Sequence, residues 1–191
     1  MRQISDKIQY TLLYICLLIF AGKSSAQGSD PLERVRDIIL NDETTLDFTG
    51  SPVAASDSIR IVNYLSEAST LQGINPDSSL SFILKALDIA LRERSPELIS
   101  LSVQYLGDYF ISREMYKEAM SCYLKSIRLE EKGKDELRIA DLNDKLGSVY
   151  YYLEVFDKSL DYYLKALGKF QAENDTSGIA RVFDHLGSLH S

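Results

Sequence analysis

The sequence predicts an all-α fold made of stacked helical hairpins, and three observations support this prediction. A phrase that begins with Leu-Gly recurs at a constant interval, at 106–110, 146–150 and 186–190. A second block recurs with the same spacing at 123–127 and 163–167, and an earlier copy stands at 83–87. No segment alternates apolar and polar residues over the length of a strand. A fixed period of this size is typical of supersecondary units that stack on their neighbours.

Composition and charge limit the classes of function. The 191 residues are 45% hydrophobic and 26% charged, which is ordinary for a soluble globular protein. Residues 1–26 hold three of the 21 basic and one of the 28 acidic residues, so the remainder carries a net charge of -9. Nucleic-acid binding requires a basic surface, and we therefore expect no nucleic-acid partner. The two cysteines, Cys16 and Cys122, leave one thiol in the body of the chain, too few for an internal disulfide.

Residues 1–26 have the layout of a secretory signal peptide. A short basic start is followed by an apolar run at 10–22, and then by Ser24 and Ala26 at positions -3 and -1 of a cleavage site. The run is shorter than the ~20 residues that span a bilayer as a helix. We therefore expect an exported protein, periplasmic or extracytoplasmic. The alternative is an uncleaved membrane anchor through residues 10–22.

Residues 27–56 are predicted to form a short helix and a linker, and helices follow from 57 onwards. Asp30 can cap the short helix, and 41–55 has the composition of a loop. The helix from about 57 to 72 is expected to end at Gly73. The following helices are expected at 76–92 and 96–112, capped by Asn75 and Ser95, and near 115–131, 136–153, 156–172 and 177–190. Consecutive helices are expected to form antiparallel hairpins.

At these residues the chain resembles tetratricopeptide repeats (TPR) in a variant with long helices. One unit carries the pattern as Val103, Leu106, Gly107, Phe110, Ala119, Tyr123 and Ser126. The next unit carries it as Asn143, Leu146, Gly147, Tyr150, Ser159, Tyr163 and Ala166. The resemblance implies TPR-type helical hairpins stacked into a right-handed superhelix, an α-solenoid. It divides 57–191 into units at about 57–95, 96–134 and 135–175, followed by a truncated unit at 176–191.

The repeated glycines and tyrosines have an expected packing role. Gly107 and Gly147 lie beside the apolar face of their helices, where the missing Cβ allows a partner helix to approach closely. Tyr123 and Tyr163 are expected to fill the wedge between hairpins. Because one hairpin cannot bury both of its faces, each unit is expected to pack against its neighbour.

The end of the chain is expected to leave an apolar face open. The last predicted helix carries Phe183, Leu186 and Leu189, and no partner helix follows it. The sequence is therefore expected to stop in the middle of a repeat. Exported arrays of this kind resemble the sensory N-terminal parts of membrane-bound bacterial regulators, which implies that a membrane-anchored output part belongs to the missing C-terminal region.

No catalytic, cofactor-binding or metal-binding residues are predicted. His185 and His190 are five residues apart, so they do not share a helical face, and neither stands at metal-ligand spacing from a carboxylate or cysteine. There is no phosphate-binding loop and no nucleophile with a plausible base beside it. We therefore expect the protein not to be an enzyme.

The resemblance also implies a binding surface, because in TPR proteins the first helix of each hairpin lines a concave groove. Its second, fifth, ninth and twelfth positions in each unit point into this groove. The predicted concave face therefore consists of Gln104, Asp108, Ile111, Asp141, Asp144, Ser148, Tyr151, Arg181 and Asp184, with Leu101 and Ser188 at the remaining positions. The Lys and Asn residues with which some TPR proteins bind a peptide carboxylate are replaced by acids. A peptide with basic and apolar groups is the expected ligand.

The sequence thus predicts an exported TPR scaffold that binds a protein or peptide, as the sensory N-terminal part of a longer signalling regulator. One alternative is a stand-alone periplasmic adaptor. Another is an enzyme that uses the concave groove, for which a strongly shifted pKa in the cleft would be the sign.

Overall fold

A computed structural model describes residues 55–133 and 135–189 of the chain. The chain divides after Thr44, and all the described residues belong to the second unit, Thr45–Ser191. The predicted signal peptide at 1–26 and the short helix that begins near Asp30 lie outside the described residues, as does His190.

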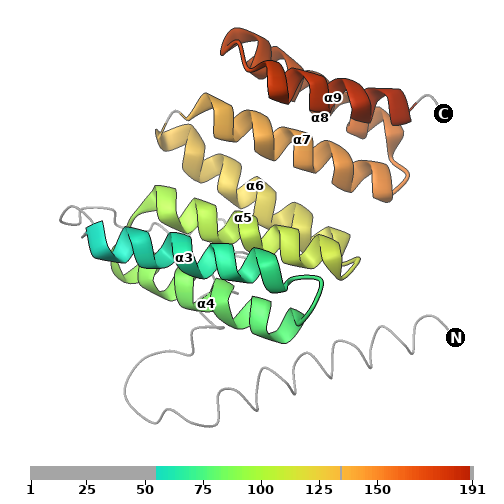
Figure 1. Cartoon of the computed structure of the whole chain (residues 1–191). Helices are drawn as coiled ribbons and strands as arrows, with labels where there is room; N and C mark the ends of the chain where they lie inside the picture. Colours follow the sequence, from blue (N-terminus) through green and yellow to red (C-terminus); the bar gives the residue numbers. More distant parts are fainter. Residues whose placement is uncertain (1–54, 134, 190–191) are drawn as a thin grey trace, which may run out of the picture. The chain divides into compact units, whose positions relative to one another are not determined.

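The described residues form seven α-helices and no strand, which confirms the all-α prediction. The helices follow one another with short turns between them, as Figure 1 shows. Their bounds are α3 (Ala55–Leu71), α4 (Pro76–Arg92), α5 (Pro96–Ser112), α6 (Tyr116–Gly133), α7 (Glu136–Tyr152), α8 (Phe156–Ala172) and α9 (Thr176–Ser188). Within this part of the chain, no helix has both the length and the apolar character needed to cross a bilayer.

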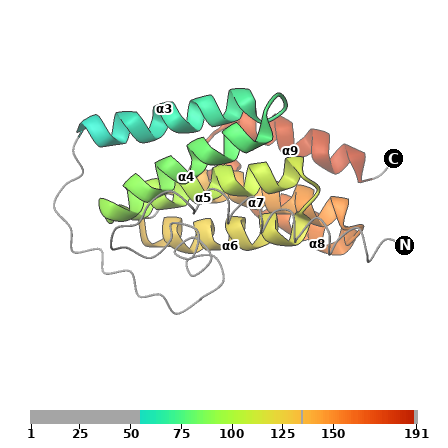
Figure 2. The ribbon, with the colours of Figure 1, turned by 90° about the horizontal axis from the view of Figure 1, so that it is seen from below.

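The helices pack as a row of hairpins. Each helix contacts the next one in the chain, and α3 also contacts α5, as α7 contacts α9. In Figure 2, α6 and α8 lie along one side of this row and α3 along the other. Packing between successive, similar helices is the arrangement of a helical repeat solenoid.

Most of the turns between helices contain one residue with a left-handed backbone, and none of these residues is glycine. They are Arg94, Glu114, Glu154 and Asn174, with φ between 52° and 60°. No described glycine has a positive φ, so Gly73 follows α3 without being its left-handed cap. The side chains of Asn75 and Ser95 cap α4 and α5 as predicted, because each accepts a hydrogen bond from a backbone N–H of the first helical turn.

The repeated glycines lie where a tyrosine ring of the second helix of the hairpin packs directly on the backbone of the first. A β-carbon at Gly107 would stand 2.5 Å from Tyr123 Cε1, and one at Gly147 would stand 2.5 Å from Tyr163 Cε1. Both distances are shorter than the non-bonded contacts that real β-carbons make, which confirms the close approach expected from the sequence. Gly178 has the same role opposite Phe170, at a distance of 2.6 Å from its Cε1, although it stands outside the repeated phrase.

Two apolar clusters continue the core along the array. One joins α6 and α7 around Tyr123, Leu142 and Leu146. The other joins α7, α8 and α9 around Tyr163, Phe170 and Val182, and Leu186 and Leu189 pack against it. The expectation of an open apolar face on α9 is therefore correct only in part: Phe183 is 55% exposed, whereas Leu186 and Leu189 are partly buried.

Candidate functional site

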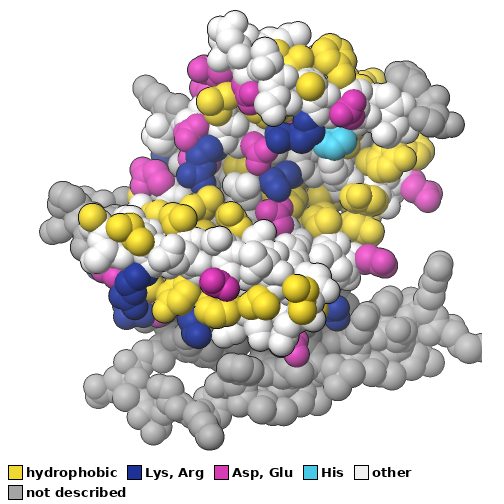
Figure 3. All heavy atoms as spheres, viewed as in Figure 1, with side chains coloured by type: hydrophobic (Ala, Val, Ile, Leu, Met, Phe, Trp, Pro, Cys, Tyr) yellow, Lys and Arg dark blue, Asp and Glu magenta, His cyan; other side chains and the backbone are white. Residues whose placement is uncertain are grey.

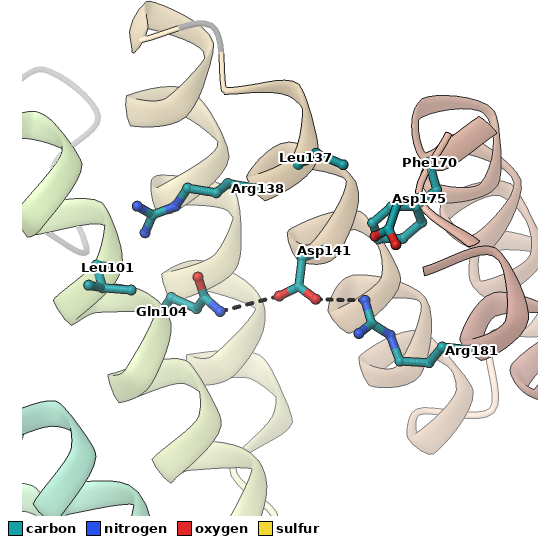
Figure 4. A pocket seen from close by; sticks show the side chains of 8 residues that line it. All are labelled: Leu101, Gln104, Leu137, Arg138, Asp141, Phe170, Asp175 and Arg181. Carbon is teal, nitrogen blue, oxygen red and sulfur yellow. Dashed lines mark hydrogen bonds and ion pairs between the residues drawn. The ribbon is translucent and has the colours of Figure 1, made fainter. Parts of the chain in front are cut away.

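The odd-numbered helices α5, α7 and α9 line a hollow of about 310 Å³ on one face of the array (Figure 4). The lining residues are Leu101, Gln104, Leu137, Arg138, Asp141, Phe170, Asp175 and Arg181. Because α5, α7 and α9 are the first helices of successive hairpins, the hollow crosses three units.

Of the residues predicted for the concave face, Gln104, Asp141 and Arg181 line this hollow, together with Leu101. Gln104 Nε2 donates to Asp141 Oδ2 at 3.3 Å, and Arg181 Nη2 donates to Asp141 Oδ1 at 2.7 Å. Figure 4 shows these three side chains in a row from α5 through α7 to α9. The Asp141 carboxylate is thus paired with a side chain from each neighbouring unit and is not free to bind a ligand.

Asp144 is the centre of a second set of contacts. Its side chain is 4% exposed, and its Oδ2 accepts from Arg181 Nε at 2.7 Å. Its Oδ1 lies 2.7 Å from His185 Nδ1, and the imidazole ring stacks on Tyr163 with 5.1 Å between ring centroids. The sequence offered no signal for this pair, because the chain fold brings the Asp144 carboxylate to His185 from 41 residues away.

Asp108, on α5, is also paired with side chains of neighbouring helices. Its Oδ1 accepts from Lys145 Nζ at 2.8 Å and from the Tyr123 hydroxyl at 2.6 Å. Its backbone carbonyl accepts from Gln72 Nε2 at 2.7 Å. Asp108 therefore connects the end of α3 with α5, α6 and α7.

Three of these polar contacts share one sequence separation, whereas Asp141 and Arg181 are 40 residues apart and Asp144 and His185 are 41 residues apart. Three pairs are separated by 37 residues in the sequence: Gln104 and Asp141, Asp144 and Arg181, and Asp108 and Lys145. This separation is slightly shorter than one repeat, so a side chain meets a residue about one helical turn earlier in the next odd-numbered helix. We call the six residues of these three pairs, together with His185, the polar ladder. On the face seen in Figure 3, charged side chains of both signs are interleaved over α7 and α9.

The remaining predicted residues of the concave face lie outside the hollow. Ile111 packs against the apolar cluster of α6 and α7, and the Tyr151 ring contacts Phe156. Ser148 Oγ accepts from the Tyr163 hydroxyl at 3.2 Å. Asp184 is exposed on α9, where its backbone carbonyl accepts from Ser188 Oγ at 3.1 Å.

The electrostatics of the site follow from this pairing. Burial tends to lower the pKa of the Arg181 guanidinium, but Asp141 and Asp144 outweigh it and the pKa is raised. Burial, reinforced by the Asp108 charge and hydrogen bond, raises the pKa of Tyr123. Both side chains therefore keep their protons throughout the physiological pH range.

Sequence reasoning missed several residues of the hollow. Leu137 supplies apolar surface, and Phe170 lines the hollow although it is only 2% exposed. Asp175 caps α9 through a hydrogen bond from the backbone N–H of Ser177 at 3.1 Å. Arg138 reaches from the hollow to the buried Glu130, with 3.1 Å between Nε and Oε1. Of these, only Asp175 carried a signal in the sequence, because Asp before Thr-Ser is a common helix start.

Residues that could hold a metal ion are absent from the described part: it places no three His, Cys, Asp or Glu side chains together for that purpose.

Known proteins resemble this chain in structure. No protein family and no curated protein matches the sequence. Among solved structures, the chain is similar to the crystal structure of BtubC (BKLC) from P. vanneervenii, with 18% identity and a TM-score of 0.48. The likeness covers 72% of this chain, which spans 66% of the length of that one. At this TM-score the likeness carries no argument about function.

Proposed function

We propose that the protein is an exported TPR-type scaffold, not an enzyme, that binds a segment of a protein or a peptide in the hollow between α5, α7 and α9. We further propose that it is the sensory N-terminal part of a longer signalling regulator, and that its hairpins form a right-handed superhelix. The stand-alone periplasmic adaptor is the alternative. The observation that carries the binding proposal is the hollow itself, which is shared by three successive units.

The side chains of the hollow restrict the chemical class of ligand that can bind there. Asp141 is already paired with Arg181, so its carboxylate is less available to a basic peptide than the sequence suggests. Leu101 and Leu137 offer apolar surface, and Leu137 is 43% exposed, whereas Phe170 lines the hollow but is only 2% exposed. The Gln104 amide offers hydrogen bonds at the edge of the hollow. We infer an extended peptide segment that places one apolar side chain in the hollow and its backbone along Gln104.

A selection of displayed random peptides on the whole chain tests this proposal. Selected peptides are titrated against the wild type, against Leu137→Glu in the hollow and against Leu164→Glu on α8. Both leucines are half exposed, so neither change disturbs the core. We expect Leu137→Glu to weaken binding at least about tenfold, or about 1.4 kcal/mol, and Leu164→Glu to leave it unchanged. Equal binding to all three proteins would contradict a ligand site in the hollow.

Export is supported by the sequence of residues 1–26 and is tested separately. We expect the exported protein to begin at Gln27 by mass spectrometry, because Ser24 and Ala26 suit cleavage after Ala26. A product that begins at Met1 would favour the uncleaved anchor.

A further inference from the structure

The hollow between α5, α7 and α9 contains one carboxylate without a cationic partner. Four charged residues line it. Arg138 is paired with Glu130, and Asp141 and Arg181 are paired with each other. Asp175 is the fourth, and none of the described Lys, Arg and His residues forms an ion pair with it. Its negative charge therefore remains available in the wall of the hollow.

One oxygen of Asp175 has no partner among the described residues. The residue is the N-cap of α9, and its Oδ1 accepts from the Ser177 backbone N–H at 3.1 Å. No described group donates a hydrogen bond to Oδ2. The residue is partly exposed, and Figure 4 shows its carboxylate beside Phe170, across the hollow from Leu101. The Oδ2 atom can therefore accept a hydrogen bond from a bound molecule.

The same capping position is open one unit earlier. Asp135 caps α7 through a hydrogen bond from the Arg138 backbone N–H at 3.0 Å, and it is exposed although α8 and α9 follow it. An exposed carboxylate at this position is therefore found inside the array as well. Asp175 differs from Asp135 because it lines the hollow.

The hollow also offers apolar surface to the molecule that reaches Asp175. Leu101 and Leu137 line it, and Leu137 is 43% exposed. A lysine side chain matches this combination, because its four-carbon stem packs on apolar groups and its ammonium tip pairs with a carboxylate. An arginine pairs best with both oxygens of a carboxylate, but the cap of α9 already uses Oδ1. The wall of the hollow therefore favours lysine over arginine.

We propose that the peptide bound in the hollow carries a lysine whose ammonium group pairs with Asp175 Oδ2 and whose stem packs on Leu137. This inference rests on the proposed function, because it requires a peptide in the hollow. In an extended peptide, side chains two residues apart point to the same side and lie about 7 Å apart. The lysine therefore stands two residues from the apolar side chain that enters the hollow.

A selection of displayed random peptides tests this motif. It is run in parallel on the whole chain as wild type, as Asp175→Asn and as Asp135→Asn. Asparagine is as good an N-cap as aspartate, so each variant loses one charge and keeps its cap. We expect enrichment of a lysine two residues from an apolar residue on the wild type and on Asp135→Asn. This enrichment is expected to be absent on Asp175→Asn.

A titration of one selected peptide measures the contact directly. Replacing its lysine by glutamine is expected to weaken binding to the wild type about fivefold at low salt, as for an ion pair at the upper end of the exposed range. The same replacement is expected to leave binding to Asp175→Asn unchanged. Replacement by arginine is expected to weaken binding to the wild type as well, and equal or tighter binding would overturn the preference for lysine.

The failure of this inference is distinguishable from the failure of the proposed function. Binding that Leu137→Gln weakens is located in the hollow, because this change removes apolar surface without adding charge. Peptides that bind there without a preference for lysine overturn the inference alone. A preference that Asp175→Asn retains also overturns it, because the ammonium group then pairs with another carboxylate. Loss of the preference in both asparagine variants overturns it by attributing the effect to net charge. A selection that yields no peptide on the wild type refutes the proposed function together with the lysine site.

Discussion

The ring of Tyr163 lies over Gly147 so closely that a β-carbon at this glycine would stand 2.5 Å from its Cε1 atom. The tyrosine is 2% exposed and belongs to the cluster that joins α7, α8 and α9. The distance between the two helices of the hairpin is therefore set by a residue without a side chain. Tyr123 and Gly107 have the same relationship one unit earlier.

Replacing Gly147 by leucine is expected to lower the free energy of unfolding by about 2 kcal/mol or more, because overpacking a core typically costs about 1–3 kcal/mol. Gly168→Leu is the matched control: it lies within α8, and nothing lies within 4 Å of a β-carbon built there. This control is expected to gain up to about 1 kcal/mol from better helix propensity. Urea denaturation measures both changes, and similar midpoints for the two variants would contradict the close packing at Gly147.

The pair of Asp144 and Arg181 is expected to contribute more than a surface ion pair. Asp144 is 4% exposed at its side chain, so its carboxylate depends on partners in the chain. A double-mutant cycle with Asp144→Asn and Arg181→Met is expected to give a coupling energy of about 1–2 kcal/mol, within the range for residues in contact. The exposed pair of Asp57 and Arg60 should give about 0.5 kcal/mol or less. Equal coupling in the two pairs would refute a structural role of the polar ladder.

The helices of this protein are largely predictable from its sequence, whereas the polar ladder is not. Breaks such as those at Asn75 and Ser95 are local signals, and the structure places helix boundaries within a few residues of them. The ladder depends on the stagger between helices of different units. The repeat period suggests contacts between equivalent positions of successive units, and Asp141 and Arg181 make one at a separation of 40. The side chains of Asp144 and Arg181, however, are not equivalent and meet at a separation of 37.

The pairing of side chains on the predicted concave face could not be predicted from the sequence either. Repeat positions indicate which side of a helix a residue lies on, but not whether the next helix is near enough to pair with it. Asp141 and Asp144 were expected to offer free charge, and both are engaged by Arg181. Phe170, on the second helix of a hairpin, enters the hollow beside them, which no rule about first helices predicts.

Stability is expected to depend on pH through Glu130. Burial raises the pKa of this carboxyl, and Ser100 and Arg138, which act to lower it, do not outweigh burial. The folded chain therefore holds this proton more tightly than the unfolded chain. The resulting stability is present below the unfolded pKa, near the ordinary value of 4.5, and is lost as the pH rises through the folded pKa.

The variant Glu130→Gln tests this dependence, since it keeps the neutral shape of the side chain at every pH. Relative to the wild type, it is expected to gain stability between pH 4 and pH 7, as measured by urea midpoints. Glu131→Gln is the control, because the neighbouring glutamate is exposed. A pH profile of Glu130→Gln that runs parallel to the wild type would contradict the raised pKa.

The thiol of Cys122 is expected to be unreactive in the folded protein. Its side chain is fully buried, and burial raises the pKa of the thiol, so both access and the reactive thiolate are lacking. N-ethylmaleimide should label the peptide that contains Cys122 only after urea unfolding, as read by mass spectrometry. Labelling of the folded chain at the rate of a free thiol would show that α6 opens readily.

Amide exchange is expected to be faster in α9 than in α7. The α9 helix has 13 residues and packs on one side through Val182, Leu186 and Leu189, whereas Phe183 and Gly187 are exposed. An isolated helix of this length is marginal in water, so its protection depends on that one packed side and on Arg181. Hydrogen exchange followed by mass spectrometry should show residues 176–189 opening before 136–152. Arg181→Met should speed exchange in α9 further and leave α5 unchanged. Uniform protection from α5 through Leu189 would contradict this dependence on one packed side.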